Sequence, residues 1–428
     1  MTRGVRVGFF GNVANALFQV VRAVRDGAGI DAHLYVSRTD AFSSRPETVD
    51  PALDGALLPW IHDGDWITPS AILAPWRAPI TRELRQYDLV VVSGAGPIFA
   101  QWTGRPWGWF VTGGDLTVKP FPIAFLGWYD GWKQKAGELV GGVWQRRGAR
   151  RADRLWVQPF GPMADGLRRL HVPAAAISPD YLPIVLDVDD FRPDRPFGHP
   201  DDPVVQRMQA ADLAVLHPSR LLMRADPRLN RTGQWKGNDV LIRGFAQLVR
   251  TGEVPDPLLV MLDTGLSRDL ALGKALVTEL GIDRQVVWAK PSRPDTFPRH
   301  RLLDLYLAAD VVGSDFGAGW FGYVTLEGLA VGKPVLNHID AGPMAQLYPD
   351  GHPLVEAATP DEVSAQLLRL WRDPAEAARI GTESRRWVVA HHSPEAAGAR
   401  YVRAMNEMIA SLSGNEPTSP GVSSPEND

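Results

Sequence analysis

The sequence predicts a mixed α/β protein made of two doubly wound domains that face each other across a cleft. Short apolar runs alternate with amphipathic helical segments, and this alternation stops at one polar stretch and then restarts. Because buried parallel strands read as continuous apolar runs, each series predicts a parallel sheet covered by helices. The chain of 428 residues is also too long for one ordinary core, which favours two domains.

The first half of the chain contains five apolar runs of strand length. They are VRVGFF (5–10), DAHLYV (31–36), YDLVVVSG (87–94), WGWFVTGG (107–114) and RLWVQP (154–159). Between the first two runs lies NALFQVVRAVRDGAG, whose apolar residues recur at helical spacing and which contains glycines at its end. Residues 1–185 are therefore predicted to form an N-terminal, Rossmann-like domain.

A stretch rich in proline and aspartate separates the two series. Residues 183–203 show no sustained period, so 186–210 is predicted to be a linker and 211–392 the C-terminal domain. The strands expected in that domain lie at 211–219, 258–265, 285–290, 309–316 and 334–339. A terminal helix at 393–412 is expected to pack back toward the first domain, and the polar tail at 413–428 is expected to be disordered.

Composition excludes several classes of protein. A net charge of −4 argues against a general nucleic-acid-binding protein. The absence of cysteine excludes disulfides, thiolate zinc sites and a cysteine nucleophile. No apolar stretch approaches the length of a membrane span, and the apolar core near the N-terminus is too short for a signal peptide, so a cytoplasmic protein is expected.

Residues 317–322, GAGWFG, carry the spacing G-x-G-x-x-G between an apolar run and a helical one. Glycines at such a point let the backbone approach a phosphate, with helix N–H groups as donors. Glycines that only allow an ordinary loop to turn would give the same sequence pattern. The pattern fits a dinucleotide site, with Asp340 near the distance of a ribose-binding acid, and it fits a nucleotide-sugar site equally. Against the dinucleotide, little chain follows the loop, Glu327 has no use in that pattern, and two upstream cations stay unexplained.

Those cations are Arg220, after the strand expected at 211–219, and Lys236, which opens the next helix. Open α/β sheets bind ligands at the carboxyl ends of their strands. Arginine offers a bidentate fork to phosphate oxygens and lysine a mobile point charge, so this pair is suited to neutralising a diphosphate leaving group. The alternative is two solvated surface charges.

The sequence around these residues resembles that of a known protein family. The stretch LHPSR…QWKGNDVLIRGFAQLV…LYLAADVVGSDFGAGWFGYVTLEGLAVGKPVLN resembles the donor domain of retaining GT-B glycosyltransferases of group 1, the family 4 type. FFGNVANALFQVVRAVRDGAG resembles the family's first loop and helix, VTGGDL its acceptor-side segment, LPIVLDVDDFRPD its linker, and HHSPEAAGARYV its terminal helix. The resemblance covers about residues 5–410.

The resemblance implies roles for particular residues. Arg220 and Lys236 match the positions that clamp the nucleotide diphosphate, and Glu327 matches the second glutamate of a Glu-x7-Glu motif, expected on the ribose hydroxyls. Gly319 stands at the first glutamate, so the carboxylate for the sugar hydroxyls is missing unless Asp315 reaches in. The implied donor-binding residues are Gly11, Asp315, Gly319, Phe321, Gly322, Tyr323, Val324 and Glu327.

The implied catalytic residues are Arg220, Lys236 and Asp115. Asp115, in the VTGGDL segment, is expected to orient an acceptor hydroxyl, with capping of the next turn as its alternative role. No metal is expected, because the aspartates of DVDD at 187–190 lie in the linker rather than in a formed pocket. No cofactor is expected either, since the nucleotide sugar is a substrate.

The implied activity is transfer of a sugar from a nucleotide-diphosphate sugar to the hydroxyl of a sugar, lipid-linked or small-molecule acceptor, in the synthesis of a glycan, polysaccharide or glycoconjugate. No carboxylate is positioned for a covalent route, and the resemblance implies a front-face, oxocarbenium-like step with retention. The leaving diphosphate then accepts the acceptor's proton, and the protein supplies positioning and electrostatic relief. Two alternatives remain: a nucleotide-sugar-binding protein that has lost its chemistry and, behind it, an NAD-binding enzyme.

Residues 127–154 combine aromatic residues with a basic helix. Trp128, Tyr129 and Trp132 precede or open it, and its basic residues are Lys133, Lys135, Arg146, Arg147, Arg150 and Arg151. Such a segment can lie on an anionic membrane, which would suit a lipid-linked acceptor at the inner face of the membrane. A solvated helix with its tryptophans in the core is the alternative.

Overall fold

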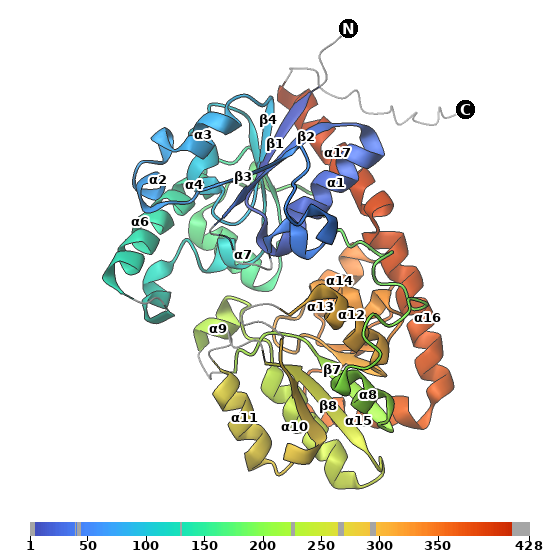
Figure 1. Ribbon diagram of the computed structural model, residues 1–428. Coiled ribbons are helices and arrows are strands. Elements are labelled where there is room, and N and C mark those ends of the chain that lie inside the picture. Colours follow the sequence, from blue (N-terminus) through green and yellow to red (C-terminus); the bar gives the residue numbers. More distant parts are fainter. Residues whose placement is uncertain are drawn as a thin grey trace, which may run out of the picture.

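The computed structural model describes residues 5–38, 40, 44–128, 131–223, 227–263, 269–291 and 297–412. Its strands form two six-stranded sheets, one in each half of the chain, and every strand pair is parallel. Figure 1 shows the two halves one above the other. Two doubly wound α/β halves were predicted, and this fold class is confirmed. The tail expected at 413–428 lies outside the described residues, as does Tyr129.

The first sheet has the strand order β3-β2-β1-β4-β5-β6. Its strands are β1 (Arg6–Phe10), β2 (Asp31–Ser37), β3 (Ile61–Gly64), β4 (Leu89–Val92), β5 (Trp107–Phe110) and β6 (Arg154–Trp156). The strand order reverses between β1 and β4, where Val7 lies opposite Leu89. The strand β3 was not predicted, because its sequence, IHDG, contains no apolar run.

The second sheet has the order β12-β11-β10-β7-β8-β9. Its strands are β7 (Leu213–His217), β8 (Pro257–Leu262), β9 (Val286–Ala289), β10 (Val311–Gly313), β11 (Val335–Asn337) and β12 (Val355–Glu356). The order reverses between β7 and β10, and ligands of open α/β sheets bind at the carboxyl ends of the strands at such a switch point. The two-residue strand β12 was not predicted.

Helices connect the strands in both halves. The first half contains α1 (Ala16–Ala28), α2 (Pro69–Leu73), α3 (Pro79–Leu84), α4 (Pro97–Ala100), α5 (Gly114–Thr117), α6 (Trp132–Ala149) and α7 (Gly161–Leu170). The rest of the chain contains α8 (Pro203–Gln209), α9 (Pro227–Arg231), α10 (Asn238–Thr251), α11 (Leu270–Glu279), α12 (Arg299–Ala308), α13 (Tyr323–Ala330), α14 (Ala341–Leu347), α15 (Pro360–Arg372), α16 (Pro374–His392) and α17 (Pro394–Leu412). None of the helices described is both long and apolar enough to cross a membrane.

Each sheet separates two apolar cores, because successive side chains of a buried strand point to opposite faces. In β1, Phe9 packs into one core and Phe10 into the other. The helix α17 packs against α1 and contributes Tyr401 to the core of the first half, and Figure 1 shows it running along one side of the molecule. The polar segment 186–210 is anchored as well, since Phe191 is buried in the core of the second half.

Candidate active site at the strand switch points

The two predicted cations lie at the switch point of the second sheet. Arg220 follows β7, Lys236 lies just before α10, and Asp315 follows β10. The Lys236 Nζ donates to Asp315 Oδ2 at 2.5 Å. This ion pair joins the loop after β10 to the loop before α10, two segments 79 residues apart in sequence.

Asp315 also organises the glycine turn. Its carboxylate is nearly buried, and Oδ1 accepts hydrogen bonds from the backbone N–H groups of Gly317 and Ala318, each at 3.0 Å. Gly317 has to be glycine, because a Cβ there would lie 2.3 Å from the carbonyl oxygen of Trp235. Both of its oxygens accept hydrogen bonds within the protein, and a contact of Asp315 with a donor sugar stays a prediction.

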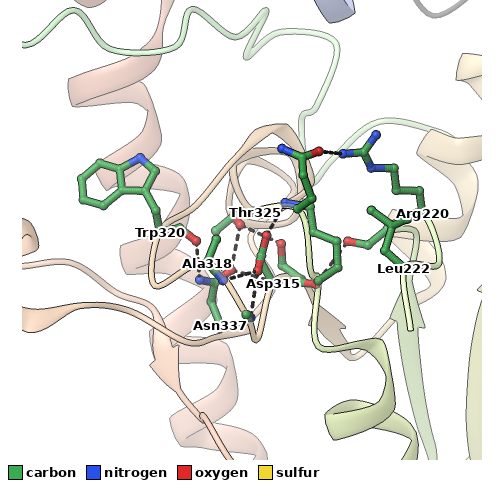
Figure 2. Close-up of polar contacts among 12 residues, drawn as sticks. Arg220, Leu222, Asp315, Ala318, Trp320, Thr325 and Asn337 are labelled. Atoms are coloured by element: carbon green, nitrogen blue, oxygen red, sulfur yellow. Dashed lines mark hydrogen bonds and ion pairs between the residues drawn. The ribbon is translucent and has the colours of Figure 1, made fainter. Parts of the chain in front are cut away.

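A buried amide holds the same turn from the neighbouring strand. Asn337, at the end of β11, is fully buried, and its Nδ2 donates to the Trp320 carbonyl at 3.0 Å. Its Oδ1 accepts from the Asp315 backbone N–H at 3.1 Å and from Thr325 Oγ1 at 3.0 Å. Figure 2 shows Asn337 between these groups. The glycine turn is therefore fixed both to β10 and to the first turn of α13.

Arg220 is exposed, and one of its guanidinium nitrogens donates to Gln234 Oε1 at 2.8 Å. The backbone of its loop is held by Asn238, whose Nδ2 donates to the Arg220 carbonyl at 3.2 Å and whose Oδ1 accepts from the Leu222 N–H at 2.9 Å. Asn238 Nδ2 also contacts Nε2 of the buried His217 at 2.7 Å. This polar network fixes the position from which the guanidinium projects.

The helix α13 begins directly after the glycine turn, at Tyr323. No side chain caps its N-terminus at Gly322, so its first N–H groups, including that of Val324, have no side-chain acceptor. Such a helix end favours a phosphate group. The ring of Phe321 is buried in the core against Trp320, at 4.8 Å between ring centroids, and the role of Phe321 in donor binding stays a prediction. The ring is buried because a large apolar ring gains more from burial than from exposure at the loop.

Two other expected donor residues, Glu327 and Tyr323, differ in their hydrogen bonding. Glu327 Oε2 accepts a hydrogen bond from the Tyr306 hydroxyl at 2.8 Å, and burial raises the pKa of its carboxyl group. The nearby Arg299 opposes that increase in the pKa of Glu327. The Tyr323 hydroxyl is buried and has no hydrogen-bond partner among the described residues, while its ring packs against cores of both halves. The role of Glu327 at a ribose stays a prediction.

In the first half, Gly11 lies at the other switch point, between β1 and β4. Its φ of +90° and the 2.3 Å that would separate a Cβ from the Ser93 carbonyl oxygen both require glycine. Its own carbonyl accepts a hydrogen bond from the Ser93 hydroxyl. This close approach of two backbones explains Gly11 without a ligand.

Asp115 is 3% exposed. Its carboxylate accepts hydrogen bonds from the Gly94 N–H at 3.1 Å, from Trp109 Nε1 at 3.1 Å and from the Thr112 N–H at 3.0 Å. Burial raises the pKa of this carboxyl group, and the donors oppose that shift. The expected contact with an acceptor hydroxyl would need an exposed oxygen, so the geometry favours the alternative, in which Asp115 holds the turn that begins α5.

The carboxyl ends of the two sheets meet next to Arg220. A Cβ added to Gly114 would lie 3.6 Å from Nε2 of Gln234, the residue that orients Arg220. One step further, Thr117 Oγ1 donates to the Thr232 carbonyl at 3.0 Å. The loop after β5 therefore lies against the loop that holds the cations.

Metal-binding geometry is not found in the described parts of the chain, where no group of three or more His, Asp or Glu side chains could hold an ion. Two aspartates of the DVDD segment form ion pairs instead. Asp187 pairs with Arg22 at 3.5 Å and Asp190 with Arg299 at 3.1 Å.

The structure adds three positioning residues that the sequence analysis missed: His217, Asn238 and Asn337. All three are buried, and each is a polar residue at a strand end or a helix start beside a predicted site segment. That placement is a signal available in the sequence, because a polar residue within an apolar run must find partners inside the protein.

Two doubly wound halves, each built on a parallel six-stranded sheet, are the arrangement of the GT-B fold. Residues 228–387 match the family described as glycosyl transferases group 1. This match lies in the C-terminal half of the chain and agrees with the predicted resemblance to group 1 glycosyltransferases.

Two curated relatives illustrate the match. The chain is 26% identical over 245 residues to a GDP-mannose-dependent alpha-(1-6)-phosphatidylinositol monomannoside mannosyltransferase of Mycolicibacterium smegmatis, covering 55% of this chain and 57% of the relative. It is 28% identical over 193 residues to a D-inositol 3-phosphate glycosyltransferase of Rhodococcus opacus, covering 41% and 42%. The chain thus spans about half the length of the curated relatives it matches.

Solved structures resemble the whole chain in fold. Anabaena Alr3699/HepE in complex with UDP and glucose aligns with a TM-score of 0.62 at 16% identity, over 94% of this chain and 100% of that one. Sucrose-phosphate synthase from Thermosynechococcus elongatus aligns with a TM-score of 0.60 at 17% identity, over 95% and 100%. At this identity the likeness shows the GT-B fold alone.

Proposed function

We propose that this protein transfers a sugar from a nucleotide-diphosphate sugar to an acceptor hydroxyl, with retention and without a catalytic metal. The observation that carries the proposal is the placement of two cations, Arg220 and Lys236, at the same strand switch point. They lie next to the glycine turn and the uncapped N-terminus of α13. These groups supply the donors that a diphosphate needs.

The chemistry breaks the bond between the anomeric carbon and a phosphate oxygen, and the bonding electrons stay on the diphosphate. Lys236 has three N–H donors, of which Asp315 takes one, so the others remain for the growing phosphate charge. The acceptor oxygen attacks the same face of the sugar, and its proton passes to the leaving phosphate oxygen. Cations fixed before the reaction stabilise that transition state more than the ground state.

Relatives of the chain support the acceptor class. One is named for a phosphatidylinositol monomannoside and another for D-inositol 3-phosphate, so both names contain an inositol compound. We therefore propose a sugar, a polyol or a lipid-linked polyol as the acceptor of this chain. HepE structures hold UDP and UDP-glucose, which supports a nucleotide sugar as the donor.

Part of the basic segment 127–154 is proposed to contact an anionic membrane at the inner face. Trp132 is 74% exposed at the start of α6, beside the exposed Lys133, and Ile123 is 73% exposed in the neighbouring 3-10 helix Pro122–Trp128. Arg146, by contrast, is engaged with the Pro120 carbonyl. The proposed contact is therefore the start of α6 rather than its whole length.

The test of the proposed function begins with a thermal-shift screen of GDP, UDP and ADP and their sugars, followed by transfer assays with the donor that stabilises the protein. Arg220→Ala and Lys236→Ala are each expected to lower turnover by about 10²–10³-fold. The double variant should fall short of the combined loss, because both residues act on one group. Arg220→Lys should restore little, since the bidentate fork is lost.

Lys290→Ala is a matched control, because Lys290 is an exposed cation after β9 of the same sheet. It should leave turnover unchanged. Near-wild-type turnover in both Arg220→Ala and Lys236→Ala would refute the diphosphate clamp and the mechanism with it.

Gly319 favours a second candidate function, a protein of the same fold that binds a nucleotide sugar without transferring it. A glycine at this position offers no side chain to a sugar. Slow hydrolysis of the bound nucleotide sugar by the purified protein distinguishes the two, because a binding protein that lacks the chemistry leaves its ligand intact.

A further inference from the structure

Gly319 lacks a side chain, but the space beside it holds a carboxylate from another strand. Its φ of +67° lies in the left-handed region that favours glycine. A Cβ built on Gly319 would lie 3.3 Å from both Cγ and Oδ2 of Asp340. The Asp340 carboxylate thus occupies the direction in which a side chain at 319 would project.

The backbone fixes Asp340 in that place. It lies three residues beyond β11, the strand next to β10, and its N–H donates to the Gly319 carbonyl at 2.8 Å. The carboxyl ends of β10 and β11 therefore present two aspartates, Asp315 and Asp340, on either side of the glycine turn.

These two aspartates differ in how their charge is used. Asp315 is 6% exposed and is fully engaged with Lys236 and with backbone N–H groups. Asp340 is exposed, and within the described ranges its carboxylate has no hydrogen-bond or ion-pair partner. It does not cap α14 either, since its side chain makes no hydrogen bond to that helix.

A free carboxylate at this edge repels phosphate, so it is unsuited to the diphosphate itself. It is suited to neighbouring hydroxyl groups, because an ionised carboxylate is an acceptor with two oxygens. In a nucleotide-diphosphate sugar, hydroxyls flank the diphosphate on both sides, on the ribose and on the transferred sugar. Because Glu327 is the residue predicted for the ribose, Asp340 is available for the transferred sugar.

We propose that Asp340, seated over Gly319, accepts hydrogen bonds from hydroxyls of the transferred sugar and so helps to select it. This inference rests on the proposed function. It assigns to the loop after β11 a side-chain contact with sugar hydroxyls, which the glycine at position 319 cannot make.

The experiment compares a nucleoside diphosphate with its sugar conjugate in calorimetry, using the pairs GDP and GDP-mannose, UDP and UDP-glucose, and ADP and ADP-glucose. In Asp340→Ala, the affinity for the free diphosphate should stay within about twofold of wild type, whereas the affinity for the sugar conjugate should fall by about 10- to 100-fold. Asp340→Asn, which keeps the size but loses the charge, should show a smaller loss. With the active donor, KM should rise in Asp340→Ala more than kcat falls.

Asp350→Ala is the matched control, because Asp350 is an exposed aspartate beyond the other end of α14. It should behave as wild type toward every ligand. Thermal unfolding should be unchanged in all three variants, since both side chains are exposed.

Equal losses for the diphosphate and its sugar in Asp340→Ala, or no loss for either, would overturn the assignment of Asp340 and leave the proposed function standing. A wild-type protein that binds the free diphosphates and none of the sugars would overturn the assignment too. A wild-type protein that binds no diphosphate in any pair would overturn the proposed function itself, and the role of Asp340 with it.

Discussion

His217 is the residue whose protonation should most directly disturb the cation loop. It ends β7, three residues before Arg220, and burial lowers its pKa to about 4. The Gly313 carbonyl, 2.8 Å from Nδ1, is only an acceptor, so Nδ1 carries the proton and Nε2 accepts from Asn238. A second proton on Nε2 would face the Asn238 amide donors. The amide cannot turn over, because its other contacts to Leu222 and the Arg220 carbonyl hold it.

The magnitude follows from the two pKa values. A histidine with its ordinary pKa of 6.5 when unfolded and about 4 when folded favours the folded state in its neutral form. Stability from this group is therefore fully present above pH 6.5 and is lost as the pH falls toward 4, by roughly 3 kcal/mol. The buried His392, whose pKa is lowered to about 3, adds a loss of the same sign that extends to lower pH.

The assay is urea unfolding between pH 7.5 and pH 4 for wild type and His217→Asn. Asparagine keeps a donor for the Gly313 carbonyl but has no group that titrates. We expect this variant to be less stable than wild type near pH 7 and to lose roughly 3 kcal/mol less on acidification. His171→Asn is the control, because His171 is exposed and has a φ of +52°, which asparagine tolerates. Parallel stability curves for wild type and His217→Asn would refute the reasoning.

Three further predictions concern the donor site and the start of α6. Glu327→Ala should weaken binding of the free nucleotide by roughly 1.5–3 kcal/mol in calorimetry if the carboxylate bonds the ribose, and unchanged affinity would sink that role. Asn337→Ala should lower the free energy of unfolding by about 2–4 kcal/mol in urea, because it leaves the Trp320 carbonyl and the Asp315 N–H without their partner; a loss under about 0.5 kcal/mol would contradict this. In flotation with anionic liposomes, binding should be salt-sensitive and should weaken when Trp132 and Lys133 are both replaced by alanine; wild type that stays unbound has no membrane role.

The strands that the sequence predicted are those whose burial shows in an apolar run. β7 and β8 lie near the middle of their sheet, where both faces are covered, so nearly every residue is apolar. The edge strands β3 and β12 were missed for the opposite reason. A short strand at an edge has few neighbours to bury it, so its sequence lacks an apolar run and resembles that of a loop.

The candidate site also has features that the sequence predicted and features that it did not. The positions of Arg220 and Lys236 follow from strand ends and from the rule that ligands bind there. The pairing of Lys236 with Asp315 was not predicted, because it depends on two loops being folded against each other. The burial of Asp115 was missed for a similar reason: its letters describe a polar turn, and only the packed structure supplies three donors around it.

Under the proposed function, the charges at the switch point should determine which anions bind there. Arg220 and Lys236 are balanced by Asp315 and Asp340, so these four side chains carry no net charge when all are ionised. A polyanion gains nothing from a general positive field in such a place. A ligand must use the donors that the aspartates leave free, namely the remaining Lys236 N–H groups, the Arg220 fork and the first N–H groups of α13. Under the proposed function, a compact diphosphate would reach these donors together, and its attached sugar would lie where Asp340 offers an acceptor instead of a donor.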